Sequence, residues 1–295
     1  MGADLNQTVN TAVLLTGATG FVGRQIHRAL SAAGHDVRVV IRTGTAARLD
    51  VPGAEIRESP DLFAEDAGWW AQACAGRTCV IHAAWFVDPA RYLAAPENLD
   101  CVRGTLALAR GAVAAGVGHV VGLGTCFEYA LPSHHLTFDA PLAPQSLYAR
   151  CKADLFHILT DYFAGTGTQF SWARLFYLHG AGENPARLVP YLRSCLESGA
   201  PARLSSGTQI RDFLDVTEEG AQIAGLVTTA QPGAINICSG QPVTVRQLAE
   251  RIADEYGRRD LLEFGIAPPR AGDPAAVVGV SNLMSLPFVG KVERR

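Results

Sequence analysis

The stretch LLTGATGFVG, residues 14–23, passes from aliphatic residues to a glycine-rich segment and back to apolar residues. Its glycines, Gly17, Gly20 and Gly23, lie three apart, and residues 21–33 have the apolar spacing of a helix. A strand, a glycine-rich turn and a helix form the setting in which such a turn binds a dinucleotide, because N–H groups at a helix N-terminus favour a pyrophosphate. We therefore predict a dinucleotide site here; the alternative is a purely structural turn.

Each of the three glycines has a separate role in such a turn. Gly17 permits the tight turn, Gly20 lets the backbone contact the phosphate, and Gly23 lets the helix pack closely. We assign cofactor contacts throughout the loop, to Gly17, Thr19, Gly20, Phe21, Val22 and Gly23.

Short apolar segments alternate with helical segments along much of the chain. Strands are predicted at 13–15, 36–42, 78–84, 119–125, 170–176 and 234–239, and helices at 21–33, 98–115, 146–163, 186–198, 217–229 and 244–256. This alternation predicts a doubly wound α/β domain, in which helices cover both faces of a parallel sheet. From about residue 180 prolines interrupt the pattern, and we expect a smaller lobe over the carboxyl edge of the sheet.

The composition excludes several classes of protein. The chain has 295 residues, 48% of them hydrophobic, and a formal net charge of −3, so it shows no basic surface for nucleic acid. Its seven cysteines are scattered without a CxxC pair, which favours reduced thiols in a cytoplasm over disulfides or a metal site. The polar N-terminus lacks a secretion core, and five glycines and His119 interrupt the most apolar stretch, 111–124, so we predict no membrane span.

The end of the second predicted strand indicates which dinucleotide binds. An acidic residue there usually accepts hydrogen bonds from the adenosine ribose, but this strand ends in Arg42, and Arg48 follows six residues later. A carboxylate would repel a 2′-phosphate, whereas a guanidinium pairs with one. We therefore predict NADP(H) rather than NAD(H); the alternative is a solvated arginine.

A tyrosine, a lysine and a threonine form the candidate catalytic group. Tyr148 and Lys152 are four residues apart on a predicted helix and so share one face. A phenol loses its proton near pH 10, and the lysine ammonium should lower that pKa while also holding a ribose hydroxyl. Thr125 ends a predicted strand at the edge where parallel strands line a ligand crevice, so its hydroxyl is placed to hold a substrate oxygen.

Together these motifs resemble the extended short-chain dehydrogenase/reductase superfamily, in its nucleotide-sugar branch. The segments TGATGFVG, IHAA (81–84) and GT (104–105) are similar to the family's cofactor motifs, and the threonine, tyrosine and lysine occur in the family's order. The segments GTQIRDFLDV (207–216), NICSGQPVTVRQLAERIA (236–253) and RAGDPAAVVG (270–279) resemble its C-terminal motifs.

The resemblance implies further site residues and a division of the chain. Cofactor contacts are expected at Arg42, Asp61, Leu62, Ala83, Ala84 and Lys152, and substrate contacts at Glu128, Tyr177, Asn184 and Arg211, the last on the nucleotide diphosphate. His179 is a further sugar-pocket candidate. Residues 1–178 are expected to form a Rossmann domain to which 207–240 returns, and residues 179–206 and 241–295 a nucleotide-sugar-binding lobe.

Departures from the family pattern narrow the reaction. The family's 4,6-dehydratases carry Asp-Glu directly after the threonine as acid and base, and here Cys126 and Phe127 stand there, so we reject a dehydratase. Glu128 follows one residue later and is either a site residue or structural. The epimerases usually carry an acidic residue where this chain has Arg42. GTCFEY resembles a subgroup of nucleotide-sugar 4-ketoreductases from deoxysugar pathways.

The sequence thus predicts an NADPH-dependent reductase. Its expected substrate is the 4-keto group of a nucleotide-linked, dTDP-type, 4-keto-6-deoxyhexose. The alternatives are a nucleotide-sugar 4-epimerase with tightly bound NAD and, more remotely, a non-catalytic NADP(H)-sensing regulator. The apolar stripe of the helix at 146–163 is wider than one sheet-facing side requires, and relatives pair through this helix and the one near 98–115, so we also expect a homodimer.

Overall fold

The main sheet has seven parallel strands. The computed structural model of the chain describes residues 10–270 and 272–284. The strands lie in the order β11 (Gly233–Ile237), β7 (Gln169–Leu175), β5 (His119–Thr125), β4 (Cys79–His82), β1 (Ala12–Thr16), β2 (Asp36–Arg42) and β3 (Glu55–Ser59). Every neighbouring pair is parallel. The predicted doubly wound α/β fold is confirmed, with one strand more than the apolar pattern indicated.

The additional strand, β3, lies at the edge of the sheet beside β2. Four of its five residues are exposed, and even Ile56 leaves 43% of its surface in solvent. The strand has no run of buried apolar residues, which is the signal by which the other strands were predicted.

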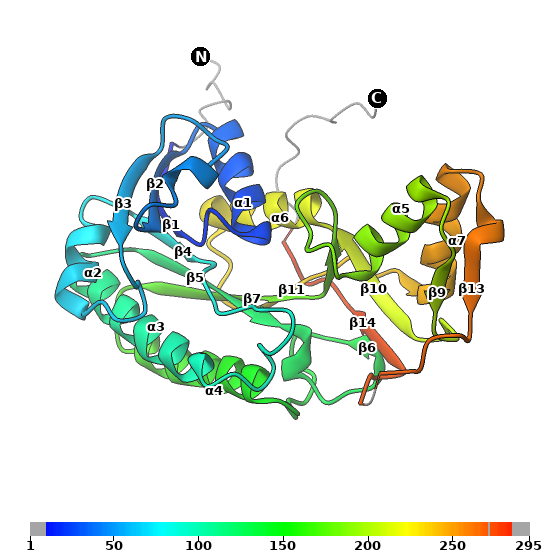
Figure 1. Cartoon of the computed structure of the whole chain (residues 1–295). Coiled ribbons are helices and arrows are strands. Elements are labelled where there is room, and N and C mark those ends of the chain that lie inside the picture. The colour runs from blue at the N-terminus through cyan, green and yellow to red at the C-terminus, as the bar shows by residue number, and fades with distance from the viewer. Residues whose placement is uncertain (1–9, 271, 285–295) are drawn as a thin grey trace, which may run out of the picture.

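Helices cover both faces of the main sheet. α1 (Phe21–Ala32) and α6 (Val216–Thr229) lie on one face, and α2 (Ala67–Cys74), α3 (Glu97–Ala114) and α4 (Leu147–Ala164) lie on the other (Figure 1). Each layer has its own core: Ile26 and Ile223 belong to the first, and Leu108 and Leu155 to the second.

A smaller lobe lies beyond the carboxyl edge of the main sheet (Figure 1). Its strands β12 (Pro242–Thr244), β10 (Ile210–Asp215), β14 (Ala276–Gly279) and β6 (Ser133–Leu136) form a second sheet, and β8 (Tyr177–His179) pairs with β10. Strands β9 (Ala202–Leu204) and β13 (Leu262–Phe264) pair beside α5 (Leu188–Ser198) and α7 (Val245–Glu255). Three short 3-10 turns complete the described elements: η1 (Ala46–Arg48), η2 (Cys126–Glu128) and η3 (Arg259–Leu261).

The segment 207–240 serves both parts of the molecule. Its strand β10 belongs to the second sheet, whereas α6 packs on α1 and β11 joins the main sheet. β6, from the first half of the sequence, also lies in the second sheet beside β14. The two lobes are therefore interleaved along the chain.

The strand order reverses direction between β1 and β4. From β1 the chain continues to β2 and β3 on one side, and it then returns to β4 on the other. In open α/β sheets the crevice for ligands lies at such a switch point, outside the carboxyl ends of the strands. The glycine-rich turn follows β1 at this point.

The predicted helices, the cysteines and the absence of a membrane span can also be compared with the structure. The predicted helices are present with ends shifted by a few residues, the largest change being at 186–198, where α5 begins at Leu188. All seven cysteines are unpaired. Among the described residues, none of the helices combines the length and apolar character needed to cross a bilayer. The polar N-terminal segment and the end of the predicted 241–295 lobe lie outside the described residues.

Candidate active site

The glycine-rich turn has backbone geometry that side chains would prevent. Gly17 has φ +76°, and a Cβ there would lie 2.8 Å from the carbonyl carbon of Ala83. A Cβ on Gly23 would lie 2.2 Å from the carbonyl oxygen of Gly17. Gly20 is the N-cap of α1 and supplies no side-chain hydrogen bond, and the first turn of α1 has no acidic residue. The N–H groups at this helix end are thus available to an anion, which fits a dinucleotide pyrophosphate.

The end of β4 is fixed against this turn by a buried histidine. His82 shares hydrogen bonds of 2.9 Å with the Thr16 hydroxyl and 3.0 Å with the Thr105 hydroxyl. The Ala84 N–H donates to the Thr16 hydroxyl oxygen at 3.1 Å. Burial, and next the charge of Lys152, lower the pKa of His82 to about 3, so the imidazole is neutral. This network explains the IHAA and GT motifs in physical terms: they hold the loop after β4 beside Gly17.

Two exposed arginines lie at the other end of the turn. Arg42 ends β2, and Arg48, in η1, donates a hydrogen bond to the Thr19 carbonyl oxygen at 3.4 Å. Asp61 follows β3, is exposed, and accepts a hydrogen bond from the Phe63 N–H at 3.0 Å. Leu62 beside it is partly buried, against the core under α2 and α3. The structure thus brings Arg48 to the glycine turn, while Arg42 and Asp61 stay in solvent.

The threonine, tyrosine and lysine meet at the carboxyl end of β5. Tyr148 lies in the first turn of α4, whose N-cap, Ser146, accepts a hydrogen bond from the Ala149 N–H at 3.2 Å. Thr125 ends β5, is only 6% exposed, and lies close enough to Tyr148 for its hydroxyl to lower the pKa of the phenol. Lys152 follows one helical turn after Tyr148 and is almost fully buried. The predicted triad therefore assembles.

The contacts of Lys152 differ from the sequence-based expectation. Its ammonium donates to the Leu123 carbonyl oxygen at 2.5 Å and lies 3.6 Å from the centre of the Trp85 ring, which is a close cation–π contact. Trp85 is held in turn by its indole N–H, which donates to Asn98 at 2.8 Å, and it meets the Tyr148 ring edge-on. Trp85 is a site residue that the sequence motifs do not predict.

The pKa values of the triad also differ from the expectation. Burial, and next the neighbouring Tyr92, raise the pKa of Tyr148, while the hydrogen bond from Thr125 lowers it. Burial lowers the pKa of Lys152 to about 7. The prediction that Lys152 lowers the pKa of the Tyr148 phenol is therefore wrong for the chain by itself, because burial raises that pKa and the group that lowers it is Thr125.

Glu128 is a buried residue rather than an exposed site residue. Its carboxylate forms an ion pair of 2.7 Å with Arg174 and accepts hydrogen bonds from the Thr125 N–H at 2.8 Å and the Trp172 indole at 3.1 Å. The side chain is fully buried. These contacts favour a structural role over contact with a substrate. The T-x-x-E pattern of a capping box, Thr125 to Glu128, was the sequence signal for this arrangement.

Aromatic side chains lie beside the triad on the lobe side. Tyr177 meets Phe127 and Phe213 edge-on, each with ring centres 6.0 Å apart. Arg211 lies 5.0 Å above the Tyr177 ring and is only 2% exposed, and its guanidinium donates to Asp273 at 2.7 Å. The segments GTQIRDFLDV and RAGDPAAVVG are thus joined by this ion pair.

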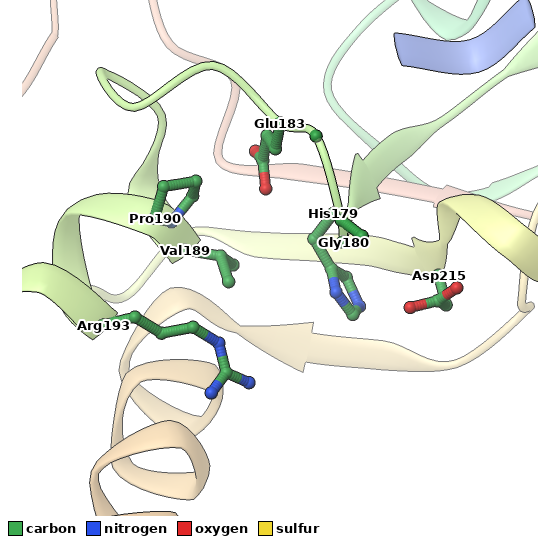
Figure 2. A pocket seen from close by; sticks show the side chains of 9 residues that line it. His179, Gly180, Glu183, Val189, Pro190, Arg193 and Asp215 are labelled. Atoms are coloured by element: carbon green, nitrogen blue, oxygen red, sulfur yellow. The ribbon is translucent and has the colours of Figure 1, made fainter. Parts of the chain in front are cut away.

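A cavity of about 440 Å³ opens at the carboxyl ends of β8 and β10. Figure 2 shows His179, Asp215 and Arg193 around it, with Glu183 on the loop above. Burial raises the pKa of Glu183 to about 7, and no described residue gives its Oε2 atom a hydrogen bond. Of these residues only His179 is predicted from the sequence as a candidate; Glu183, Asp215 and Arg193 are not.

One predicted substrate residue, Asn184, follows Glu183 on the loop after β8. Asn184 is exposed, and its side-chain oxygen accepts a hydrogen bond from the Ala186 N–H at 2.9 Å. The side chain is thus used to stabilise its own turn.

Comparison with known proteins identifies the family. A sequence profile of the NAD dependent epimerase/dehydratase family matches residues 13–238. The chain belongs to this family. The resemblance predicted from the motifs is thereby confirmed, and the glycine turn, β4 and the triad all lie within the matched segment.

Relatives of this family member have several activities. A dTDP-6-deoxy-L-talose 4-dehydrogenase (NAD(+)) of Aggregatibacter actinomycetemcomitans is 24% identical over 269 residues, or 90% of this chain and 98% of the relative. A GDP-6-deoxy-D-mannose reductase of Pseudomonas aeruginosa is 30% identical, over 82% of this chain and 79% of the relative. The crystal structure of DesIV, a dTDP-glucose 4,6-dehydratase of Streptomyces venezuelae with NAD bound, has a TM-score of 0.79, 26% identity, and coverage of 94% of this chain and 92% of that one.

Proposed function

We propose that this protein is an NADPH-dependent 4-ketoreductase acting on a dTDP-linked 4-keto-6-deoxyhexose. The observation that carries the proposal is the meeting of Thr125, Tyr148 and the buried Lys152 at the carboxyl end of β5, where Trp85 contacts both the Tyr148 ring and the lysine ammonium. Two residues that a dehydratase needs are missing next to it, because Cys126 and Phe127 can act neither as acid nor as base. What is left at this centre is a proton donor for a carbonyl oxygen.

The residues of this chain fit a dinucleotide without rearrangement of the backbone. Gly17 and Gly23 let the turn pack closely against Ala83 and Ala84 and against α1, and the N–H groups at the N-terminus of α1 are then placed to bind the pyrophosphate. The guanidinium groups of Arg42 and Arg48, in solvent after β2, favour a 2′-phosphate over a bare ribose. When bound, NADPH supplies the hydride that reduces the carbonyl carbon.

The chain supplies the proton and holds the substrate oxygen. Burial keeps the phenol of Tyr148 protonated at neutral pH, so it donates its proton to the oxygen as the alcohol forms. The Thr125 hydroxyl holds that oxygen, and Lys152, once charged, holds the cofactor's ribose. A pKa near 7 leaves Lys152 evenly divided between its two forms, so the binding of a negatively charged cofactor favours the ammonium.

The substrate side is suited to a deoxysugar. Phe127, Tyr177 and Phe213 pack edge to face, and we place the sugar's methyl group against these rings, which suit it better than a hydroxymethyl group. Arg211 would take the nucleotide diphosphate, which requires it to exchange part of its contact with Asp273. The names of the two relatives, which refer to dTDP-6-deoxy-L-talose and GDP-6-deoxy-D-mannose, support a 6-deoxyhexose.

We also propose a homodimer formed through α3 and α4. Each helix presents a large apolar side chain to solvent: Leu99 is 59% exposed and Ile158 is 47% exposed. Covering such side chains against a second copy removes apolar surface from water. A monomer by light scattering at micromolar concentration would contradict this assembly.

The experiment that tests the function is a single-turnover reaction with 4-deuterated NADPH and a panel of dTDP-linked 4-keto-6-deoxyhexoses. We expect one NADPH consumed per sugar and deuterium on C4 of the product. A 4-epimerase, the second candidate within the family, would interconvert sugars without consuming added cofactor and would leave the product free of deuterium. That outcome would replace the proposal.

A further inference from the structure

Glu128 lies at the centre of a buried polar network beneath the triad. One carboxylate oxygen accepts the Thr125 N–H at 2.8 Å and the Trp172 indole at 3.1 Å. The other accepts Arg174 Nε at 2.7 Å. Glu128 and Arg174 are buried to within 1% of their surfaces, and a buried ion pair of this kind requires close hydrogen bonding on both partners to form at all.

Strand β5 is shaped to accommodate this network. A Cβ on Gly124 would lie 2.3 Å from the Trp172 indole nitrogen and 2.5 Å from a Glu128 carboxylate oxygen. A Cβ on Gly122 would lie 2.5 Å from the Trp172 ring. The two glycines on either side of Leu123 therefore make room for an indole and a carboxylate. Leu123 is also the residue whose carbonyl oxygen accepts the Lys152 ammonium.

The network has a second end that leads away from the triad. Arg174 donates to the Tyr129 hydroxyl at 2.9 Å, and Tyr129 donates to Asn236 in β11 at 2.6 Å. The Asn236 amide donates to the Leu136 carbonyl oxygen at 2.8 Å. This end joins the main sheet to the second sheet and has no contact with Thr125, Tyr148 or Lys152 in any hydrogen bond of the described residues.

We propose that Glu128 is a positioning residue for the reduction, which fixes the backbone of Thr125 so that the threonine hydroxyl meets the Tyr148 phenol. The inference rests on the proposed ketoreductase function. The Thr125 side chain has two contacts to satisfy, since its oxygen also accepts the Phe127 N–H at 3.3 Å. The Glu128 carboxylate holds the Thr125 N–H, so the peptide group before Thr125 cannot rotate without breaking this bond. The Thr125 hydroxyl is thereby kept directed toward Tyr148.

The same carboxylate acts on the charge of the triad. Its negative charge raises the pKa values of both Lys152 and Tyr148. Loss of the charge therefore lowers the pKa of Lys152, and the high-pH limit of any reaction that needs the ammonium moves to lower pH. A residue that served only to hold the fold together would not move this limit.

The test compares Glu128→Gln with Tyr129→Phe. Glutamine removes the charge and has one acceptor oxygen in place of two, so it cannot hold both the Thr125 N–H and Arg174 as the carboxylate does. Phenylalanine cuts the same network at its far end. For Glu128→Gln we expect kcat to fall by about 10- to 100-fold, while KM and NADPH affinity stay within about threefold of wild type. In the plot of kcat against pH, the decline at high pH should move to lower pH. For Tyr129→Phe we expect lower thermal stability, a kcat within about threefold of wild type, and a high-pH decline of kcat at the same pH as in wild type.

An activity-independent measurement separates this inference from the function itself. The chain has only two lysines, Lys152 and Lys291, so NMR of selectively labelled lysine resolves the titration of Lys152, with Lys152→Arg as the assignment control. We expect a lower Lys152 pKa in Glu128→Gln and an unchanged one in Tyr129→Phe. If no ketosugar is reduced but this shift is seen, the proposed function fails while the coupling of Glu128 to the triad stands.

Two outcomes would overturn the inference. One is a loss of kcat in Glu128→Gln and Tyr129→Phe that follows their loss of stability, with the high-pH decline of kcat at the same pH in both variants. The other is an unchanged Lys152 titration in Glu128→Gln. If Glu128→Gln does not fold, Trp172→Phe serves in its place, because it removes the indole donor from the carboxylate and keeps the charge and the ion pair. This variant tests positioning alone, and a kcat equal to wild type would then overturn the proposal.

Discussion

The catalytic centre and the adenosine end of the site are built in opposite ways. At the centre, Thr125, Lys152 and Glu128 are buried and hydrogen-bonded within the protein. At the adenosine end, Arg42 and Arg48 are exposed, and the contact of Arg48 with the loop is a single bond of 3.4 Å. Buried groups are oriented before ligand binds, so changes there should affect turnover most. Exposed groups become ordered only on binding, so changes there should affect selectivity by smaller factors.

The largest effect is expected for Tyr148→Phe. The variant keeps the ring and its edge contacts with Trp85 and Tyr92, but it has no transferable proton. Turnover should fall by about 10²- to 10⁴-fold, the usual contribution of general acid catalysis, while the fold and NADPH affinity remain. The measurement is NADPH oxidation with a dTDP-linked 4-keto-6-deoxyhexose. Near wild-type turnover would rule out the mechanism proposed for this centre.

Thr125→Val tests the second member of the buried centre. It removes one hydrogen bond to the forming alkoxide and one to the phenol, and it keeps a β-branched side chain at the end of β5. Turnover should fall by about 10- to 10³-fold, less than for Tyr148→Phe in the same assay. A loss as large as that of Tyr148→Phe would show that the variant also disturbs the η2 turn, which circular dichroism and thermal unfolding would detect.

The sequence predicted the parts of the site that depend on local spacing. The glycine turn and the triad each follow from residue types at fixed distances along one strand and one helix, and the structure assembles both. The network of Glu128, Trp172 and Arg174 was not predicted, because it joins β7 to the turn after β5 through side chains 44 and 46 residues apart. Likewise Trp85 reaches Lys152 from a loop without regular structure.

The pKa of the phenol was wrongly predicted for a related reason. Spacing on a helix places Tyr148 and Lys152 on the same face, but desolvation depends on how much of the protein surrounds them. The lysine ammonium is bound by Trp85 and the Leu123 carbonyl oxygen, and burial is the largest cause of the pKa shift of each group. Such burial is a property of the tertiary structure that local sequence does not contain.

Arg42→Asp tests the exposed end of the site. A carboxylate would repel a 2′-phosphate and accept hydrogen bonds from an unphosphorylated ribose, so the preference for NADPH should fall by about tenfold or more, one charge-assisted contact. The ratio of kcat/KM for NADPH and NADH gives the result. Arg48→Ala is the matched variant, and we expect a smaller change from it. Equal use of both cofactors by the wild type would show that Arg42 has no part in the preference.

The smallest effect concerns stability at the buried centre, and its sign can be worked out from Lys152. Burial lowers the pKa of Lys152 in the folded protein to about 7, whereas a lysine in an unfolded chain has a pKa near 10.4. Between these values the unfolded chain binds the extra proton, so this group makes the folded protein gain stability as pH rises from about 7 to about 10. Below about pH 7 both states are charged, and the full cost of burying the ammonium is present. Cys101, Glu128 and Cys151 raise this pKa, but burial is the larger effect.

Lys152→Met should therefore raise the melting temperature of the protein without ligands at about pH 6, and by less at about pH 9.5, while it removes turnover and weakens NADPH binding. A gain independent of pH would mean that the lysine keeps its proton in the folded protein over this whole range, so that its pKa is not lowered. A loss at both pH values would mean that its bond to Leu123 outweighs desolvation.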